Sequence, residues 1–503
     1  MSTARPSGLS RRRFFGGIAL LGGAGLLTAC GTAAVTTSTG SGTAAATANS
    51  ATAATSAAAA TGGATTSKAA AAPAPTAAVP TPGAFATALP APAGKKAVTL
   101  RLHARAGVED QMFGIELPKF QMANPGVAVS YEVFTGSEYE QKLETLTAGG
   151  NLGDVVHLFT GDQIYQNFFV SGITIPLDNM VAQEKFDLTQ YYKYSIEGGQ
   201  VNGKLGGLPF KSHPSRCGLF YNVDLFQKAG LKEPSPDMTI DDFTNAAQKL
   251  TVPGDAATAT YGYGFLWNDL EYYECVARQY GGDLFSDDGS KWTGSTPEVQ
   301  KAWQYHYDLM NTWKVAINPL QTAPTNSDLF LSGRLGMYRA NIGNKASFLQ
   351  VNKFKWNMTV PPKGPTGQYG SYAETDLLSI TKFSKAVDAA WQLLKWLTSK
   401  EAGLELAKQT GNRSSTAGGR PDVYNDPSFL SLPGYPDGVQ KTTQMAMNQV
   451  QPYRTAANFR GPELLRTIEP TLELLILGKA KPDNAWLAKL GQDAQDVMDK
   501  PRA

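Results

Sequence analysis

The stretch that decides the fold of this chain is Gly218-Leu219-Phe220-Tyr221-Asn222-Val223-Asp224-Leu225-Phe226-Gln227-Lys228-Ala229-Gly230-Leu231. Within it, Asp224 can cap the start of a short helix, because aspartate is a preferred N-cap residue. Gly230 can end that helix, because glycine readily adopts the left-handed backbone that follows many helix C-termini. The stretch therefore predicts a short helix with defined ends.

Upstream of this stretch, predicted strands alternate with predicted helices. The apolar segments 98–103, 127–133 and 155–159 have the composition of strands, and the last of them that of a buried strand. Segments 114–122 and 138–146 predict helices, the first of which is stopped by Asn124-Pro125-Gly126. Strand–helix–strand alternation at this spacing favours parallel α/β units. The fold class expected for the chain is therefore α/β.

Downstream, helix starts are clearly marked. Thr239 with Asp242 predicts a capping box, and Thr296-Pro297-Glu298 predicts a helix start with proline in the first turn. Val387, Trp391, Leu394 and Leu397 fall on one helical face, which indicates a core stripe. The same interpretation holds for the tryptophans at helical spacing, namely Trp303, Trp313, Trp391 and Trp396. The globular region 97–503 is too long for a single core, so two lobes are expected.

Four segments in order resemble the extracellular solute-binding proteins of ABC importers, the family that includes maltose-binding and other sugar-binding proteins. They are Leu208-Pro209-Phe210 with the stretch 218–231, Phe330-Leu331-Ser332-Gly333-Arg334-Leu335-Gly336-Met337, Pro361-Pro362-Lys363-Gly364-Pro365, and Ala389-Ala390-Trp391-Gln392-Leu393-Leu394-Lys395-Trp396-Leu397-Thr398-Ser399. Together they span most of residues 97–503. The order of the four segments, more than any one of them, carries the resemblance.

The resemblance implies a periplasmic-binding-protein-like fold, with two α/β lobes, a multi-strand hinge and a ligand cleft between the lobes. The chain would cross between lobes near Pro209–Pro214, Tyr372–Leu378 and Gly411–Thr416. One lobe would then comprise about 97–210 and 377–411, and the other about 212–372 and 416–503. A monomer that delivers its solute to the permease subunits of an importer is the implied assembly.

Two positions depart from the family's pattern. Glu374-Thr375 stands where the family often carries two glycines, and Asn341-Ile342-Gly343-Asn344 stands where it often carries an aromatic residue. The cleft is therefore not a copy of a maltose site.

The N-terminus has the features of an export signal. Arg11-Arg12-Arg13-Phe14-Phe15 precedes a short apolar run and resembles a twin-arginine signal, and Leu27-Thr28-Ala29-Cys30 resembles a lipobox in which Cys30 is lipid-modified. The alternative, a transmembrane anchor, needs about 20 apolar residues, more than this run provides. The sequence therefore predicts a signal peptide over 1–29 and an extracytoplasmic lipoprotein anchored to the cell membrane.

Residues 30–96 consist almost entirely of Ala, Thr, Ser, Gly and Pro. So few large apolar residues cannot offset the entropy of ordering, so we expect a disordered tether. O-glycosylation of its threonines stays open.

Charge and cysteine content narrow the class of protein. The formal charge of +2 falls to −2 once the four arginines of residues 1–29 are removed, which gives no electrostatic basis for nucleic-acid binding. Cys217 and Cys275 can form one disulfide or remain as two buried thiols. Neither a zinc-binding pattern nor the motif of a nucleotide or redox cofactor occurs, so no metal and no cofactor are expected.

A carbohydrate site needs aromatic faces for the sugar rings and polar groups for the hydroxyls. The segment 264–273 has that composition: Trp267 can stack on a sugar ring, Asp269 can accept hydroxyl hydrogen bonds, and Tyr272 is a further candidate. In the first lobe, Arg105 and Asp162 follow predicted strands, where α/β sheets place ligands. Glu374 and Asn341 complete the expected site.

The sequence thus predicts a binding protein for a mono- or oligosaccharide rather than an enzyme. No G-x-S-x-G elbow, P-loop or dinucleotide-binding motif is present. Two alternatives stay open: the same fold binding another solute, such as a polyamine, a metal complex or a phosphodiester, and a tethered hydrolase with a carboxylate pair.

Overall fold

A computed structural model of the chain describes residues 89–94, 96–136, 138–255, 257–317, 320, 325–409 and 418–502. All of them belong to one compact unit, Thr76–Ala503. The predicted signal peptide, Cys30, nearly all of the predicted tether and the third predicted crossing at Gly411–Thr416 lie outside the described residues. Among the described residues, no helix has both the length and the apolar character that a membrane crossing requires.

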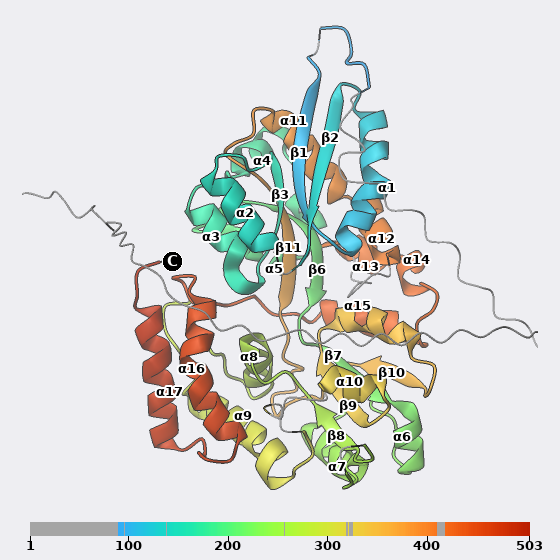
Figure 1. Cartoon of the computed structure of the whole chain (residues 1–503), viewed down its shortest axis with the longest axis vertical. Coiled ribbons are helices and arrows are strands. Elements are labelled where there is room, and N and C mark those ends of the chain that lie inside the picture. The colour runs from blue at the N-terminus through green and yellow to red at the C-terminus, as the bar shows by residue number, and fades with distance from the viewer. Residues whose placement is uncertain are drawn as a thin grey trace, which may run out of the picture. The chain divides into compact units, whose positions relative to one another are not determined.

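The first lobe is built on a five-stranded sheet with the strand order β2-β1-β3-β11-β6 (Figure 1). β1 pairs in parallel with β2 and β3, as the strand–helix alternation predicts, whereas β11 runs antiparallel to both β3 and β6. The strands are β1 (Val98–Arg105), β2 (Val127–Phe134), β3 (Val155–Phe159), β6 (Leu208–Pro214) and β11 (Ala373–Ile380), with a separate pair β4 (Gln200–Val201) and β5 (Lys204–Leu205).

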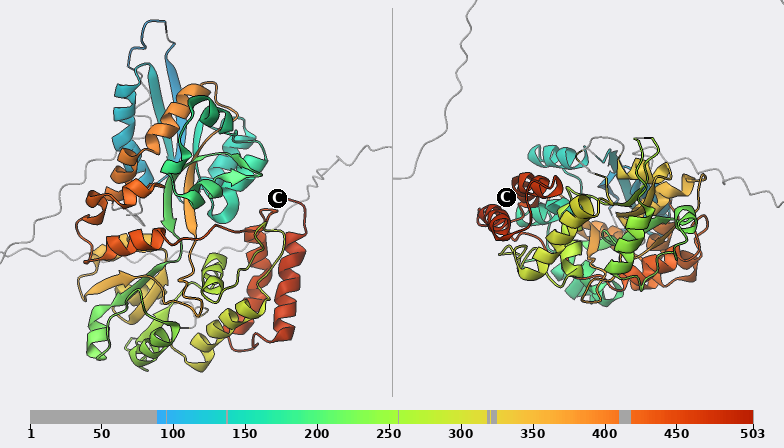
Figure 2. Two further views of the ribbon diagram at one scale, coloured as in Figure 1. Left: turned by 180° about the vertical axis from the view of Figure 1, so that it is seen from behind. Right: turned by 90° about the horizontal axis from the view of Figure 1, so that it is seen from below.

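Helices cover both faces of this sheet. Figure 2 shows helices on either side of the sheet. On one face, apolar side chains of α1, α11 and α12 pack against the strands, and on the other face those of α2 and α3 do so. Neighbouring residues of a strand serve opposite faces, as Val155 and Val156 do, because side chains alternate along a strand. The helices of this lobe are α1 (Val108–Ala123), α2 (Tyr139–Ala148), α3 (Ile164–Val170), α4 (Asp178–Glu184), α5 (Lys193–Gly198), α11 (Val387–Leu397) and α12 (Lys400–Lys408), with short 3-10 helices η1 (Gly161–Gln163) and η2 (Leu188–Gln190).

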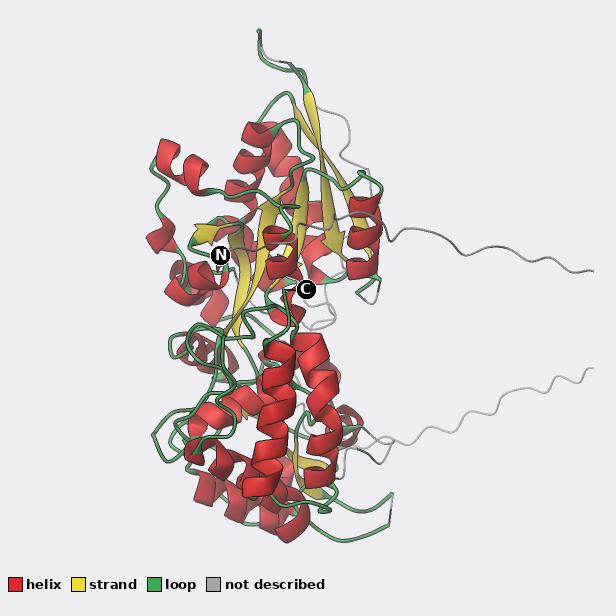
Figure 3. Ribbon diagram, turned by 90° about the vertical axis from the view of Figure 1, so that its left-hand side faces the viewer, coloured by secondary structure: helices red, strands yellow, loops and turns green. Residues whose placement is uncertain are grey.

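The second lobe is built on a four-stranded sheet with the order β10-β7-β9-β8. Its two long C-terminal helices, α16 and α17, lie side by side (Figure 3). The strands are β7 (Gly218–Asn222), β8 (Tyr261–Gly264), β9 (Leu335–Ala340) and β10 (Trp356–Thr359). The helices are α6 (Val223–Lys228), α7 (Ile240–Leu250), α8 (Leu270–Gln279), α9 (Pro297–Tyr307), α10 (Asn326–Leu331), α16 (Gly461–Ile476) and α17 (Asn484–Met498), with the π-helical turn η3 (Asp308–Thr312) and the 3-10 helix η4 (Ile342–Gln350).

Of three further helices, α13 (Pro421–Tyr424), α14 (Pro427–Leu430) and α15 (Val439–Met447), α15 lies between the two sheets in Figure 1, and α13 and α14 lie beside the lower end of the first sheet. Tyr424, Phe429 and Met447 form a small apolar cluster there with Ala373 of β11. The two sheets are therefore joined by packed side chains as well as by the crossing strands.

Most of the predicted elements are present. Thr239 and Asp242 form the expected capping box at the start of α7, and Trp303 and Trp391 are buried in the core. Cys217 and Cys275 are both buried free cysteines, so of the two possibilities the structure has the thiols.

The predicted cap at Asp224 is wrong by two residues. α6 begins at Val223, and the side chain of Asn222 accepts a hydrogen bond from the backbone N–H of Leu225 at 3.1 Å. Asn222 has the extended backbone of an N-cap residue, whereas Asp224 already lies inside the first turn and is exposed. Gly230, with a φ of 64°, follows the helix end as expected.

We expect Asn222→Ala to lower the free energy of unfolding by about 1 kcal/mol or more, because it removes the cap. Asp224→Ala should cost about 0.5 kcal/mol or less, because only a favourable charge near the helix start is lost. Urea unfolding of the 95–503 domain measures both variants. A larger loss for Asp224→Ala than for Asn222→Ala would contradict the assignment of the cap.

Candidate functional site

A cavity of about 740 Å³ lies between the two lobes and is lined by side chains from both. From the first lobe it is lined by Arg105, Glu109, Phe159, Gly161, Gln163, Lys211, His213, Glu374 and Asp376. From the second lobe and the connections it is lined by Arg216, Leu266, Asn268, Asp269, Leu270, Glu271, Glu274, Asn341, Asn344, Tyr372, Tyr453, Arg454 and Thr455, among others. Its volume lies within the range of about 300–1,000 Å³ that is typical of small-molecule sites.

The crossing strands β6 and β11 supply four of these side chains, which form two cross-strand pairs. Asp376 lies opposite Lys211, and Glu374 lies opposite His213. Residues two apart on a strand point to the same side, so both cross-strand pairs face the cavity. Just beyond Asp376 the register shifts, so that Leu377 opposes Pro209.

The first-lobe side of the cavity carries a buried ionic group that we call the Lys211 cluster, made of Arg105, Glu109, His157, Lys211 and Asp376. The Nζ atom of Lys211 lies 2.6 Å from Glu109 Oε1 and 2.7 Å from Asp376 Oδ2. His157 Nε2 lies 2.9 Å from Asp376 Oδ2, and Arg105 Nη2 lies 3.2 Å from Glu109 Oε1. Two cations thus balance two carboxylates.

These contacts keep both carboxylates ionised. Burial alone would raise the pKa of Glu109, but Lys211 and Arg105 lower that pKa to about 2. In the same way Lys211 and His157 overcome burial and hold the pKa of Asp376 well below its ordinary value. Burial opposes the charge of Lys211, yet Asp376 and Glu109 raise the pKa of its ammonium group.

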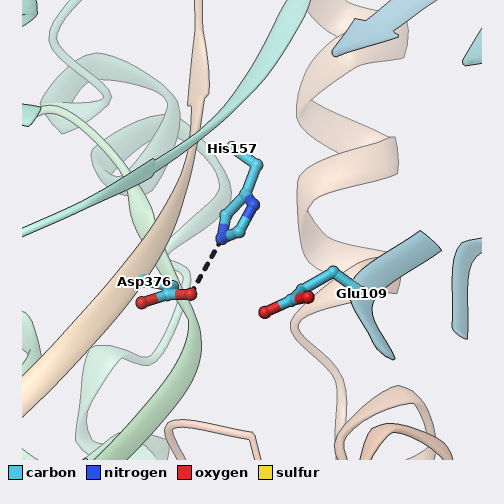
Figure 4. Close-up of side chains that lie close together, drawn as sticks. All are labelled: Glu109, His157 and Asp376. Atoms are coloured by element: carbon cyan, nitrogen blue, oxygen red, sulfur yellow. Dashed lines mark hydrogen bonds and ion pairs between the residues drawn. The ribbon is translucent and has the colours of Figure 1, made fainter. Parts of the chain in front are cut away.

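Glu109, His157 and Asp376 offer ligand atoms within 4.8 Å of one another, as a metal site would (Figure 4). The ammonium group of Lys211, however, already bridges the two carboxylates. A metal ion would have to displace this cation, so the geometry favours a structural ion cluster over a metal centre.

The second-lobe side carries a different ionic group, the Arg216 cluster, made of Arg216, Asp269, Glu271 and Glu374. The guanidinium of Arg216 lies 2.6 Å from Asp269 Oδ2, 2.7 Å from Glu271 Oε2 and 3.4 Å from Glu374 Oε2. Arg216 itself has a left-handed backbone with a φ of 50°. One cation here faces three carboxylates.

The excess of carboxylates over cations affects the pKa of Glu271. Burial raises the pKa of its carboxyl group above the ordinary value, and although Arg216 opposes that shift, Glu374 and Asp269 add to it. Glu374 behaves differently, because contacts with His213 and Arg216 and a hydrogen bond from Ser215 overcome burial and lower its pKa.

Four of the residues predicted from the sequence line the cavity: Arg105, Asp269, Asn341 and Glu374. Asp269 is also the N-cap of α8, since its Oδ1 accepts from the N–H of Tyr272 at 3.0 Å. The side chain of Asn341 donates to Glu374 Oε2 at 3.3 Å. The two positions that depart from the family's pattern are thus in contact with each other.

Trp267 and Tyr272, in contrast to the prediction, do not line the cavity. Trp267 packs against the hydrophobic core of the second lobe. Tyr272 is 1% exposed, and its hydroxyl lies 3.1 Å from that of Tyr263 in the same core. Asp162 is in η1, between Gly161 and Gln163, which both line the cavity, but its side chain is outside the described part of the structure.

Lys211, His213, Arg216 and Tyr453 line the cavity but were not predicted from the sequence. The spacing of two between Lys211 and His213 on a predicted crossing strand was a usable signal, because it places both on one face. No local signal marks Tyr453. It enters the cavity because the backbone of Gln451 bridges to Tyr372 and the two tyrosine rings lie 5.0 Å apart.

The lobes also touch directly at the cavity. Gln163 of the first lobe accepts a hydrogen bond from the backbone N–H of Gly461 at 2.7 Å, and its side-chain amide bonds Thr455. Gln163 has a φ of 63°, an unusual conformation for a residue with a side chain. This contact joins the two lobes at the cavity, since Gln163 and Gly461 both line it.

Comparison with known proteins agrees with this architecture. An ABC substrate-binding protein from Listeria monocytogenes, solved in complex with cycloalternan, superposes with a TM-score of 0.68 at 21% identity and covers 80% of this chain and 99% of that one. A putative binding protein of Brucella abortus is 27% identical over 58% of this chain and 69% of its own length. The maltotriose-binding protein of Pyrococcus abyssi is 22% identical over 66% of this chain and 69% of its own length.

The family assignment rests on the longest match. The family described as "Bacterial extracellular solute-binding protein" matches residues 117–434, which is more than half of the chain and includes elements of both lobes. The chain therefore belongs to the bacterial extracellular solute-binding proteins.

Proposed function

We propose that this protein captures a carbohydrate in the cavity between its lobes and delivers it to an ABC importer. The observation that carries the proposal is the cavity of about 740 Å³ lined from both lobes. A solute in that position contacts both sheets at once, and such contacts form only when the lobes are closed. Ligand binding would therefore favour the closed form.

The lining of the cavity supports a carbohydrate. Tyr453 is a half-buried aromatic residue there, and an aromatic face suits the apolar face of a sugar ring. Carboxylates and the amides of Asn341 and Asn344 can exchange hydrogen bonds with hydroxyl groups. The maltotriose-binding relative and the cycloalternan complex point to the same class of solute.

Binding without turnover is part of the proposal. The family and the structural neighbours consist of binding proteins. We infer that the protein releases its solute unchanged.

The proposal also includes the location of the protein. We infer that Cys30 carries a lipid, that residues 30–96 tether the domain, and that the 97–503 domain works as a monomer outside the cytoplasm. The extracellular family supports the location. The lipobox-like sequence ahead of Cys30 supports the anchor.

A thermal-shift screen of the 95–503 domain tests the proposal that the solute is a carbohydrate. A sugar present at a hundredfold excess over its Kd should stabilise the fold by about 2.7 kcal/mol, because it binds only the folded state. Maltotriose, maltose, mannitol and lactose form the first panel, and product analysis after long incubation should recover each sugar intact. Release of hydrolysis products, or a shift with glycerol 3-phosphate alone, would contradict the proposal.

Two matched variants locate the site in the same assay. Tyr453→Ala should weaken sugar binding at least tenfold, because an aromatic anchor of a cavity contributes about 2 kcal/mol or more. Trp267→Ala should lower the melting temperature of the free domain and leave the affinity unchanged, because Trp267 packs against the core. The reverse pattern would move the site to Trp267.

The anchor is tested in cells by Cys30→Ala. Without the cysteine no lipid can be attached, so the protein should leave the membrane fraction or accumulate unprocessed, while the affinity of the purified domain stays unchanged. Immunoblots of membrane and soluble fractions measure the effect. Membrane retention of processed Cys30→Ala protein would show that another element anchors the chain.

A further inference from the structure

The two ionic groups of the cavity differ in charge balance. In the Lys211 cluster, Arg105 and Lys211 balance Glu109 and Asp376. In the Arg216 cluster, a single guanidinium faces three carboxylates. Buried charge without a counter-ion is costly, so one more cation would improve the charge balance of the Arg216 cluster.

The geometry shows where that cation would fit. Arg216 contacts the Oε2 atoms of both Glu271 and Glu374. Their Oε1 atoms lie near Gly161 of η1: a Cβ atom on Gly161 would be 3.4 Å from Glu271 Oε1 and 3.8 Å from Glu374 Oε1. Two carboxylate oxygens from different elements therefore converge on one point of the cavity.

A buried histidine also lines the cavity beside this point. His213 is 5% exposed, lines the cavity, and its Nε2 lies 3.8 Å from Glu374 Oε1. Its Nδ1 atom has no hydrogen-bond partner among the described residues. Burial lowers the pKa of His213, so the neutral ring does not supply the missing charge.

We propose that the solute carries a protonated amine, which binds between Glu271 and Glu374 beside Gly161. This inference rests on the proposed function and narrows its substrate class to an amino sugar. An ammonium group has three N–H donors, enough to reach both Oε1 atoms and one further acceptor. Hydrogen bonds between charged partners are about twice as strong as neutral ones, so the amine would provide most of the discrimination.

The titration of Glu271 is consistent with this assignment. Besides burial, the titratable groups Arg216, Glu374, Asp269 and Tyr372 act on Glu271. The elevated pKa of Glu271 means that its carboxyl group holds a proton near neutral pH, which reduces the excess negative charge of the Arg216 cluster. A bound ammonium would replace that proton and leave Glu271 ionised.

Matched ligands test the charge directly. Glucosamine and its β-1,4-linked dimer carry amines, and their N-acetylated forms have the same rings without the charge. Isothermal titration calorimetry on the 95–503 domain at pH 7 should show at least tenfold tighter binding of the amine in each pair. Glucose, maltotriose and spermidine complete the panel, because spermidine supplies the same cationic chemistry without a sugar.

Charge-removing variants connect the preference to these residues. Glu271→Gln and Asp269→Asn should reduce the ratio between the affinities for the amine and for its N-acetylated partner to about threefold or less. Asparagine preserves the cap of α8, so Asp269→Asn should fold. Glu401→Gln, at an exposed position of α12, is the matched control and should leave the ratio unchanged.

The outcomes separate the two proposals. Equal or tighter binding of the N-acetylated sugars would overturn the proposal that the solute carries an amine, but it would not contradict the proposal that the protein binds a carbohydrate. If spermidine binds and none of the sugars does, the proposal of a carbohydrate solute is wrong and the cation site is supported. A tenfold preference that survives both Glu271→Gln and Asp269→Asn would show that the amine binds elsewhere and overturn the assignment.

Discussion

The ammonium group of Lys211, held between Glu109 and Asp376, is the contact on which the rest of the structure depends. It joins the first turn of α1 to the two crossing strands, because Glu109, Lys211 and Asp376 come from α1, β6 and β11. Breaking a buried ion pair typically costs about 3–5 kcal/mol, since one charge is left without its partner. The same ion pairs therefore hold one side of the cavity together and fix the two strands by which the chain crosses between the lobes.

The cavity is lined by two ionic clusters that differ in charge balance. The charges of the Lys211 cluster are fully compensated, which suits a structural role. The Arg216 cluster carries excess acid and includes Glu374, which lies two residues from Asp376 on the crossing strand β11. Glu374 and its neighbour Asn341 replace the glycine and aromatic residues that the family often has, so the chemistry particular to this chain lies at the acid-rich wall. The Gln163–Gly461 contact joins the two lobes at the cavity, and Gly161 lies close to the Oε1 atoms of Glu271 and Glu374.

Much of the fold could be predicted from local sequence, and the site only in part. Val155–Phe159 and the capping box at Thr239 follow from local composition and spacing, and the structure has both. Glu374 was found because polar residues at a predicted crossing between lobes can face the cleft, and Asp269 was found from the composition of segment 264–273. Trp267 was assigned to the cleft from composition alone, and sequence composition does not tell a core-facing ring from a cavity-facing one. Tyr453 and Arg216 depend on long-range placement: one is brought in by the segment after α15, the other by the turn between β6 and β7.

The central claim is that the solute is held between the lobes by both walls of this cavity. Hydrogen–deuterium exchange of the 95–503 domain, with and without a saturating ligand from the screens, tests it most directly. The account predicts new protection in both lobes, at residues 159–164 and 211–216 from one side and at 266–271 and 453–461 from the other. Protection confined to one lobe, or to the separate groove around Asp224, Lys355 and Asp437, would contradict it.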